Sequence, residues 1–374
     1  MDYQKVLNKS INGERISLEE AVVLFKEAPL MELGETANKI RHKLHSDPRV
    51  VTFVVDRNIN YTNACTAGCR FCAFAHWPDE SKENDKIYIL KYEEIKNKIH
   101  ELVNENGTQI LLQGGHHPDL GIEYYEALFK RIKSDFPHVV LHALSPSEID
   151  HITKVDNLSL DETLNRLVDS GWESFPGGGA EILVDRVRNI LSPLKTDSDR
   201  WLEIMEAAHN KGIQGSATMM FGHVETFEER VQHMDRIRSL QDKTKGFRAF
   251  ISWPFQKGAT PLSKDERLQE GEGTGDGLDY LRTQAISRIF LDNIQNIQAS
   301  WVTMGFGIGQ VALQFGANDF GGTMMEENVV SAAGTMHSKS NTEELIYQIG
   351  KAAYKAVQRD TFYKPIKEFD TVLS

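Results

Sequence analysis

The stretch VVTFVVDRNINYTNACTAGCRFCAF, residues 50–74, begins as a run of β-branched and aromatic residues and ends in three closely spaced cysteines. Its first part, residues 50–56, is typical of a buried strand. The loop that follows carries Cys65, Cys69 and Cys72, and Gly68 allows it to curl. These are the only cysteines of the chain, so they do not form a framework of paired disulfides. We therefore expect a chemical role for this loop.

The strand at 50–56 is the first of several similar runs, and helical patterns lie between them. The predicted strands are 50–56, 108–114, 139–145, 172–178, 215–221, 246–253, 297–303 and 315–320. Helices are predicted at 92–105, 122–134, 160–170, 198–211, 226–241, 279–294 and 341–358. This alternation indicates parallel α/β structure. Eight such units fit a (β/α)₈ barrel, although a doubly wound open sheet has a similar local pattern.

The strand ends favour the barrel. Polar and glycine-rich segments follow nearly every strand, for example QGGHH at 113–117, PGGGAE at 176–181 and FGHVE at 221–225. A barrel gathers all such ends around one mouth, where barrel enzymes carry their chemistry. We predict a TIM-type (β/α)₈ barrel with a C-terminal helix over residues 49–374. Amphipathic helices within residues 1–48 form an N-terminal helical extension and a candidate lid over the mouth.

Composition limits the partners. The chain has 42 Lys and Arg against 54 Asp and Glu, a net charge of −12, which disfavours binding to nucleic acid or to an anionic membrane surface. No apolar run approaches the roughly 20 residues of a membrane span. The first residues lack the apolar segment of a signal peptide. We expect a folded, cytoplasmic protein without nucleic-acid or membrane partners.

The CxxxCxxC spacing indicates an iron–sulfur site. Three thiolates placed in this way each bind one iron of a [4Fe–4S] cluster and leave the fourth iron open to a ligand. Structural zinc with His76, His116 or His117 is the alternative, but it usually needs four protein ligands, commonly as two separated pairs. A simple electron carrier would also have four cluster ligands and a small size. The open iron therefore points to catalysis.

With an aromatic residue before its last cysteine, this loop at the end of the first barrel strand resembles the radical S-adenosylmethionine superfamily. The resemblance implies that the open iron binds S-adenosylmethionine, which yields a 5′-deoxyadenosyl radical when the cluster supplies an electron. It also implies further cofactor contacts. These are Phe71 against the adenine, Gly114 and Gly115 near the methionine part, Glu181 at the ribose or amino group, and Ser145 near the cofactor or the substrate sugar. As alternatives, Phe71 packs in the core, and the glycines and Ser145 belong to ordinary turns.

The resemblance extends along the chain through LLQGGHHPDLGIEYY, PGGGAEIL, SWVT and GANDFGGTMMEENVV. Within the superfamily, these segments are similar to the dehypoxanthine futalosine cyclases of the futalosine route to menaquinone. This implies abstraction of hydrogen from C4′ of dehypoxanthine futalosine, followed by addition of the carbon radical to the aromatic ring. A flavodoxin or ferredoxin type reductant is implied as well. Aminofutalosine synthase and the deazaflavin-chromophore enzymes are the alternatives.

Ring closure requires a base at the barrel mouth, within hydrogen-bond reach of the ring proton. His116, His117, Glu225 and Asp319 follow predicted strand ends and are the candidates. Each is equally suited to cap a helix or to support another side chain. The substrate of the implied reaction also has an aromatic carboxylate. Candidate partners for that carboxylate are Arg248, Arg282, Ser300 and Thr303.

Overall fold

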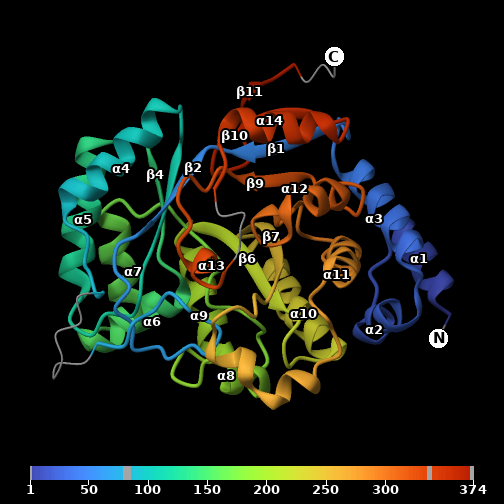
Figure 1. Ribbon diagram of the computed structural model, residues 1–374, viewed down its shortest axis with the longest axis horizontal. Helices are drawn as coiled ribbons and strands as arrows, with labels where there is room; N and C mark the ends of the chain where they lie inside the picture. Colours follow the sequence, from blue (N-terminus) through green and yellow to red (C-terminus); the bar gives the residue numbers. More distant parts are fainter. Residues whose placement is uncertain (1, 79–85, 335–338, 371–374) are drawn as a thin grey trace.

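The structure, a computed structural model, describes residues 2–78, 86–334 and 339–370 and contains one large sheet surrounded by helices (Figure 1). Its strands are β1 (Val50–Val54), β2 (Asp56–Asn60), β3 (Gln109–Gln113), β4 (Val140–Ala143), β5 (Ser174–Phe175), β6 (Gln214–Phe221), β7 (Phe247–Pro254), β8 (Asn296–Gln298), β9 (Asp319–Gly322), β10 (Lys355–Arg359) and β11 (Pro365–Glu368). The order across the sheet is β11-β10-β1-β9-β8-β7-β6-β5-β4-β3-β2.

The two halves of the first predicted strand close the sheet into a barrel. β1 and β2 are consecutive parts of one extended segment separated by Val55. β1 pairs with β9 and β2 pairs with β3, and every pairing from β2 through β9 is parallel. Because one segment stands at both ends of this series, the sheet curls until its ends meet. The predicted (β/α)₈ fold is confirmed.

Helices connect the strands of the barrel, and most of them cover its outside. They are α4 (Tyr92–Asn104), α5 (Ile122–Asp135), α6 (Pro146–Val155), α7 (Leu160–Asp169), α8 (Asp185–Leu191), α9 (Ser198–Asn210), α10 (Phe227–Thr244), α11 (Gly277–Phe290), α12 (Trp301–Ala312), α13 (Val329–Ala332) and α14 (Thr342–Lys351). Capping boxes begin α6 at Ser145 and α10 at Thr226. These caps fix where the chain leaves the barrel mouth and turns back along the outside.

Several predicted elements differ from the structure. The strand expected over 172–178 is limited to Ser174–Phe175, and the one expected over 315–320 is Asp319–Gly322. The helix expected over 341–358 ends at Lys351, and Ala353 then takes a positive φ of 64°. The following residues form β10, which pairs in parallel with β1 through Val50 and Lys355. An edge of the sheet thus overrides the local helical pattern. The strand expected over 297–303 ends at Gln298, and Ser300 and Trp301 instead begin α12.

Helices α1 (Tyr3–Ile11), α2 (Leu18–Glu27) and α3 (Leu30–Leu44) precede the barrel and lie beside α10 and α11 (Figure 1). The rings of Phe25 and Phe227 stack with their centroids 5.0 Å apart. Arg15 forms ion pairs with Asp242 and Asp292 at 2.5 and 2.8 Å. The N-terminal helices therefore brace the outer wall of the barrel.

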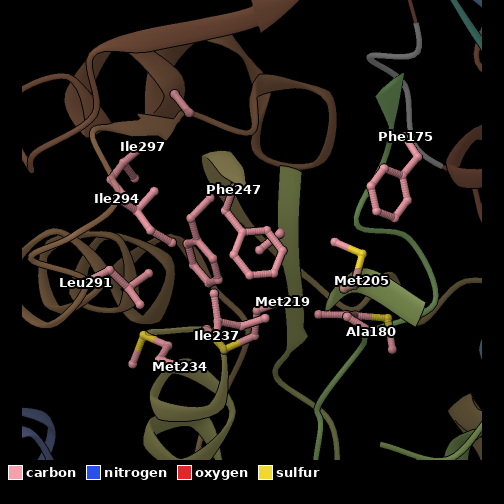
Figure 2. Close-up of a cluster of buried hydrophobic side chains, with 14 of the residues drawn as sticks. Phe175, Ala180, Met205, Met219, Met234, Ile237, Phe247, Leu291, Ile294 and Ile297 are labelled. Carbon is pink, nitrogen blue, oxygen red and sulfur yellow. The ribbon is translucent and has the colours of Figure 1, made fainter. Parts of the chain in front are cut away.

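Much of the core lies between the strands and the helices that cover them. Figure 2 shows one cluster in which Phe247 and Ile297 from the sheet meet Met234 and Ile237 of α10 and Met205 of α9. The spacing of Met234 and Ile237 places both on one face of α10. No helix of the described residues combines the length and apolarity needed to cross a membrane.

Buried histidines make folding depend on pH. Burial lowers the pKa of His233 to about 3 and that of His209 to about 4. Both rings are therefore neutral in the folded chain but take up protons below about pH 6.5 when it unfolds. The stability that they contribute is present above pH 6.5 and is lost as the pH falls toward 4.

We expect His233→Gln to weaken this pH dependence. Between pH 7 and pH 5.5, the unfolding free energy of the variant should fall less steeply than that of the wild-type protein. The two slopes should differ by up to about 1.4 kcal/mol per pH unit, the effect of one proton. Urea unfolding at both pH values measures it. An unchanged slope would show that His233 is not held neutral by the fold.

Candidate functional site

A cavity of about 440 Å³ occupies the barrel interior and reaches its mouth. Strand ends and the loops after them provide much of its lining, as the barrel arrangement predicts. The three cysteines line it from one side, together with Phe71. Several polar side chains with unsatisfied atoms face the same space, which is typical of a site that holds a polar ligand.

Hydrogen bonds from three parts of the barrel hold the cysteine loop. The Thr66 N–H donates to the carbonyl of His116 after β3 at 3.0 Å, and the Arg70 N–H donates to the carbonyl of Leu191 at the end of α8 at 2.8 Å. The Leu262 N–H donates to the Arg70 carbonyl at 2.7 Å. Gly68 has a positive φ of 61°, so it supplies the turn expected from the sequence. The loop is thus fixed by elements that are distant in sequence.

The three cysteines are placed to share one cluster. All three are free, partly exposed and on the same cavity. A [4Fe–4S] cluster takes its three thiolate ligands on separate irons. The Ala67 N–H points at the Cys65 sulfur at 3.5 Å, a donor suited to a thiolate.

A buried ion pair lies beside the thiols. Lys195 lines the cavity, and its ammonium is 3.2 Å from Oε1 of Glu181. Burial disfavours the lysine charge, but Cys69 and Glu181 outweigh this effect and raise the pKa of Lys195. Burial also raises the pKa of the Cys69 thiol to about 12, so its thiolate depends on such a cation or on bound metal.

Glu181 has two features of a ligand-binding residue. Its backbone takes a positive φ of 41°, which is uncommon for a residue with a side chain and is found most often where function requires it. Its Oε2 atom is buried and lies 3.6 Å from Nη1 of Arg188, but it has no hydrogen-bond partner among the described residues. A hydroxyl or ammonium group of a ligand would satisfy that oxygen.

Glu148 organises the glycine side of the cavity. Its Oε1 accepts hydrogen bonds from the Gly114 N–H at 2.9 Å and from the Tyr61 hydroxyl at 3.0 Å. Its Oε2 accepts from the Ser145 N–H and hydroxyl at 2.7 and 2.8 Å. Ser145 is therefore the cap of α6 as well as a lining residue. The capping pattern S-P-S-E signals this arrangement in the sequence.

The close approach of Gly115 to the cysteine loop yields a prediction. A Cβ atom at this position would overlap the Ala64 carbonyl oxygen and lie 2.8 Å from the Cβ of Cys65. We expect Gly115→Ala to displace the loop, at a cost of about 1–3 kcal/mol, and to lower iron incorporation. Iron and sulfide analysis after anaerobic reconstitution measures the effect.

Gly307→Ala is the matched control because a Cβ there meets no atom within 4 Å. This glycine lies in α12, where alanine is favoured by about 1 kcal/mol. Equal iron content in the two variants would contradict the close approach.

The structure separates the candidate bases. His116 is buried and lines the cavity, and its ring stacks on that of His151 with centroids 4.9 Å apart. Burial and the charge of Lys195 lower the pKa of His116 well below its ordinary value, so the ring is neutral. His117 is outside the lining of this cavity, and its Nδ1 accepts the Asp119 N–H at 3.2 Å.

The two carboxylate candidates are enclosed by other contacts. Glu225 accepts from the Gly222 and His223 N–H groups at 2.6 and 2.9 Å and from Arg230 at 2.8 Å. Asp319 holds Arg359 through bonds of 2.5 and 3.1 Å. Neither Glu225 nor Asp319 belongs to the lining in the part of the chain that the structure describes. Their geometry is that of a loop anchor and a counter-ion.

The candidate carboxylate partners separate in the same way. Arg248, Ser300 and Thr303 line the cavity, and the hydroxyls of Ser300 and Thr303 lie 2.8 Å apart. Arg282 instead donates to the carbonyls of Leu24 and Ala28 at 3.3 and 2.7 Å. It fastens the end of α2 to the barrel and lies outside the lining.

The expected lid is wrong. Among the described residues, the lining of the cavity begins at Val54 and includes none of the N-terminal helices. Residues of the segment after β9, including Glu327, Val329 and Val330, line the cavity instead. Figure 1 shows α13 of this segment near the centre of the view. The N-terminal helices pack where α10 and α11 present apolar surface, which their amphipathic pattern alone does not reveal.

Several lining residues have no counterpart among the sequence-predicted ones, and three of them bear on the site's chemistry. Lys195, Arg359 and Thr361 all line the cavity. Lys195 comes from the loop between α8 and α9, and the others belong to or follow β10, a segment with a helical pattern. If KAVQR, residues 355–359, had been predicted as a strand, Arg359 at its end would have been a candidate site residue.

Comparisons with known proteins agree with this site. A family model described as the radical SAM superfamily matches residues 59–237, and one described as the CofH/MqnC C-terminal region matches residues 244–371. Cyclic dehypoxanthine futalosine synthase of Halalkalibacterium halodurans is 46% identical over 99% of this chain and 96% of its own length. The protein of the same name from Streptomyces coelicolor is 42% identical over 99% of this chain and 90% of its own length.

A relative with another name is almost as similar. The 5-amino-6-(D-ribitylamino)uracil–L-tyrosine 4-hydroxyphenyl transferase of Methanococcoides burtonii is 42% identical over 93% of this chain and 95% of its own. Among solved structures, methylornithine synthase (PylB) superposes with a TM-score of 0.71 at 16% identity, covering 97% of both chains. The [FeFe]-hydrogenase maturase HydG has a TM-score of 0.74 at 15% identity over 96% of this chain and 76% of that chain. These structures show the fold, and with such relatives along nearly its whole length, the chain belongs to the radical S-adenosylmethionine superfamily and, within it, to the family of cyclic dehypoxanthine futalosine synthase.

Proposed function

We propose that this chain cyclises dehypoxanthine futalosine to cyclic dehypoxanthine futalosine in the futalosine route to menaquinone. The observation that carries the proposal is the 46% identity to a cyclic dehypoxanthine futalosine synthase along 99% of the chain. A cavity that combines three free thiols with unsatisfied polar atoms supports it. The product is the substrate less two hydrogen atoms, one lost from C4′ and one from the aromatic ring.

The cofactors are a [4Fe–4S] cluster and S-adenosylmethionine, which when bound would supply a radical able to abstract hydrogen from C4′ of the substrate. We assign Cys65, Cys69 and Cys72 as the protein ligands of the cluster. Glu181 offers its unsatisfied Oε2 to a hydroxyl or ammonium group of S-adenosylmethionine. Phe71 lines the same region, with the Lys195 ammonium 5.6 Å from its ring centroid. A reductant of flavodoxin or ferredoxin type is proposed as the electron donor.

The glycines and Ser145 complete this half of the cavity. A side chain at Gly114 would lie 2.6 Å from the ring of Tyr61, and one at Gly115 would overlap the cysteine loop. Glycine is therefore required at both positions for close packing against Tyr61 and the cysteine loop, and because both glycines line the cavity we propose that their backbone contacts the methionine part of the cofactor. Ser145 fixes Glu148 and hence the orientation of the Gly114 N–H.

Restoring the aromatic ring after closure removes one proton and one electron. The electron would return to the oxidised cluster, and the proton needs a base that faces the substrate. His116 is the sequence-predicted candidate that lines the cavity, and its neutral ring has a lone pair for the proton. We propose His116 for this role and assign Glu225 and Asp319 to support of the barrel. The segment around Glu327 and Val330 also lines the cavity.

An anaerobic assay tests the proposal. Reconstituted, reduced protein is incubated with S-adenosylmethionine and dehypoxanthine futalosine, and mass spectrometry follows the products. We expect 5′-deoxyadenosine and a product lighter by two hydrogens in equal amounts. Parallel incubations contain the aminofutalosine precursor, or tyrosine with 5-amino-6-(D-ribitylamino)uracil. Turnover of either of those with dehypoxanthine futalosine left intact would overturn the proposal in favour of the related enzymes.

A further inference from the structure

A β-bulge turns Arg248 into the cavity. Where β6 pairs with β7, Gly215 stands opposite Phe247, but the next residue, Ser216, stands opposite Ala249. Arg248 is the extra residue at this step and has no opposite residue on β6. Phe247 packs outward against Trp201 of α9, whereas Arg248 lines the cavity. Bulges commonly redirect a side chain next to an active site.

The guanidinium of Arg248 has capacity for an anion. Its Nη1 donates to the Phe362 carbonyl at 3.2 Å, and its carbon lies 4.5 Å from the centroid of the Phe362 ring. Its Nε is buried with no hydrogen-bond partner among the described residues. No carboxylate of those residues forms an ion pair with it. Arginine stays charged in proteins, so this half-buried positive charge has no carboxylate in direct contact and interacts with that of Asp360 only at longer range.

A second unsatisfied donor belongs to the turn that Arg248 contacts. Thr361 lines the cavity and is 6% exposed, and its hydroxyl has no partner within the described ranges. It precedes Phe362, the residue whose carbonyl accepts from Arg248. The strand-and-turn segment after α14 thus brings a hydroxyl donor to the same part of the cavity as the arginine.

Arg359 differs from Arg248 in having a carboxylate as a direct partner. Arg359 also lines the cavity, but Asp319 neutralises it through a buried ion pair, and the ring of Tyr363 lies 3.8 Å from its guanidinium carbon. The fold supplies a hydrogen-bonded carboxylate for Arg359, whereas among the described residues Arg248 has only the more distant Asp360. A ligand carboxylate would form an ion pair with Arg248, as Asp319 does with Arg359.

We propose that Arg248 and Thr361 form an anion subsite that binds the aromatic carboxylate of the substrate. This inference rests on the proposed function, from which the carboxylate follows. The subsite is built from β7 and the turn after β10, whereas the cysteines come from the loop after β2. Anchoring one end of the substrate away from the cysteine loop orients the remainder of the molecule within the cavity.

Binding of a matched ligand pair tests the subsite. Calorimetry on the anaerobic holoenzyme measures the affinity for dehypoxanthine futalosine and for its carboxamide analogue, which is similar in shape but uncharged. We expect the wild-type protein to prefer the carboxylate by about ten- to a hundred-fold. Arg248→Met should bring this ratio close to one, Arg248→Lys should restore part of it, and Thr361→Val should weaken carboxylate binding several-fold.

Arg282→Met is the control, because that arginine binds carbonyls of the N-terminal helices outside the cavity. It should leave the ratio unchanged. The subsite is overturned if Arg248→Met keeps the wild-type ratio while the variant retains its cluster absorption and unfolding midpoint. If the Arg248→Met variant loses its cluster absorption or its unfolding midpoint, the Arg248→Lys variant is used instead. A wild-type ratio in that variant would contradict the subsite, because lysine does not reproduce the contacts of the guanidinium. If the wild-type protein binds neither compound, the proposed function fails and the subsite with it.

Discussion

Replacing Cys65, Cys69 or Cys72 by alanine, one at a time, is expected to abolish stable cluster binding and with it the cleavage of S-adenosylmethionine. A change that only weakens the support of a metal ligand already costs about 10–100-fold in affinity or activity. Loss of a ligand itself should therefore lower deoxyadenosine formation by more than about 100-fold. Iron and sulfide content together with electron paramagnetic resonance of the reduced protein measure the cluster directly.

The cysteine content of the chain makes these variants simple to interpret. The three cysteines are the only ones in the sequence, so no other thiol can replace a missing ligand. Ala73→Ser changes the same loop without removing a thiol and serves as the control. A full complement of iron in any of the cysteine variants would show that the replaced thiol is not a ligand.

Asp319→Ala is expected to destabilise the barrel strongly. The carboxylate belongs to β9, is fully buried, and accepts from Arg359 of β10, from Thr52 of the intervening β1 and from the Gly321 N–H. Removing it leaves the arginine charge buried without a counter-ion, which costs about 3–5 kcal/mol. Urea unfolding of wild-type and variant protein measures the loss.

The double variant Asp319→Leu with Arg359→Met tests the reason for that loss. Replacing a buried ion pair by apolar side chains of similar volume is often neutral, so we expect most of the stability to return. Lys39→Ala is the surface control, since its exposed pair with Glu35 should contribute less than about 1 kcal/mol. A single Asp319→Ala variant as stable as the surface control would contradict the role of Asp319 as counter-ion.

Local pattern in the sequence predicts much of the fold. β-branched runs mark most strands from β1 to β9, and the polar groups after them mark the mouth of the barrel. The segment TQILLQGGHH, residues 108–117, illustrates this, since its apolar part forms β3 and Gly114, Gly115 and His116 line the cavity. The spacing of Cys65, Cys69 and Cys72 likewise indicates the cluster by itself, because three thiolates at these intervals suit a cubane with one open iron.

The rest depends on contacts between distant segments. KAVQR at 355–359 lies in a sequence with a helical pattern, and it becomes a strand because the edge of β1 is available for pairing. Glu225 and His116 both follow strand ends, yet Arg230 and two backbone N–H groups enclose Glu225 while His116 faces the cavity. The bulge at Arg248 arises from the register of two strands, which no local pattern encodes.

Transfer of deuterium from C4′ of the substrate to 5′-deoxyadenosine tests whether this protein abstracts hydrogen from that carbon. Dehypoxanthine futalosine labelled with deuterium at C4′ is turned over anaerobically, and the isotopic composition of the 5′-deoxyadenosine is read by mass spectrometry. We expect deoxyadenosine that carries one deuterium, formed together with a cyclised product that has lost the deuterium. Unlabelled deoxyadenosine, with the label retained in the substrate or product, would contradict the proposed reaction.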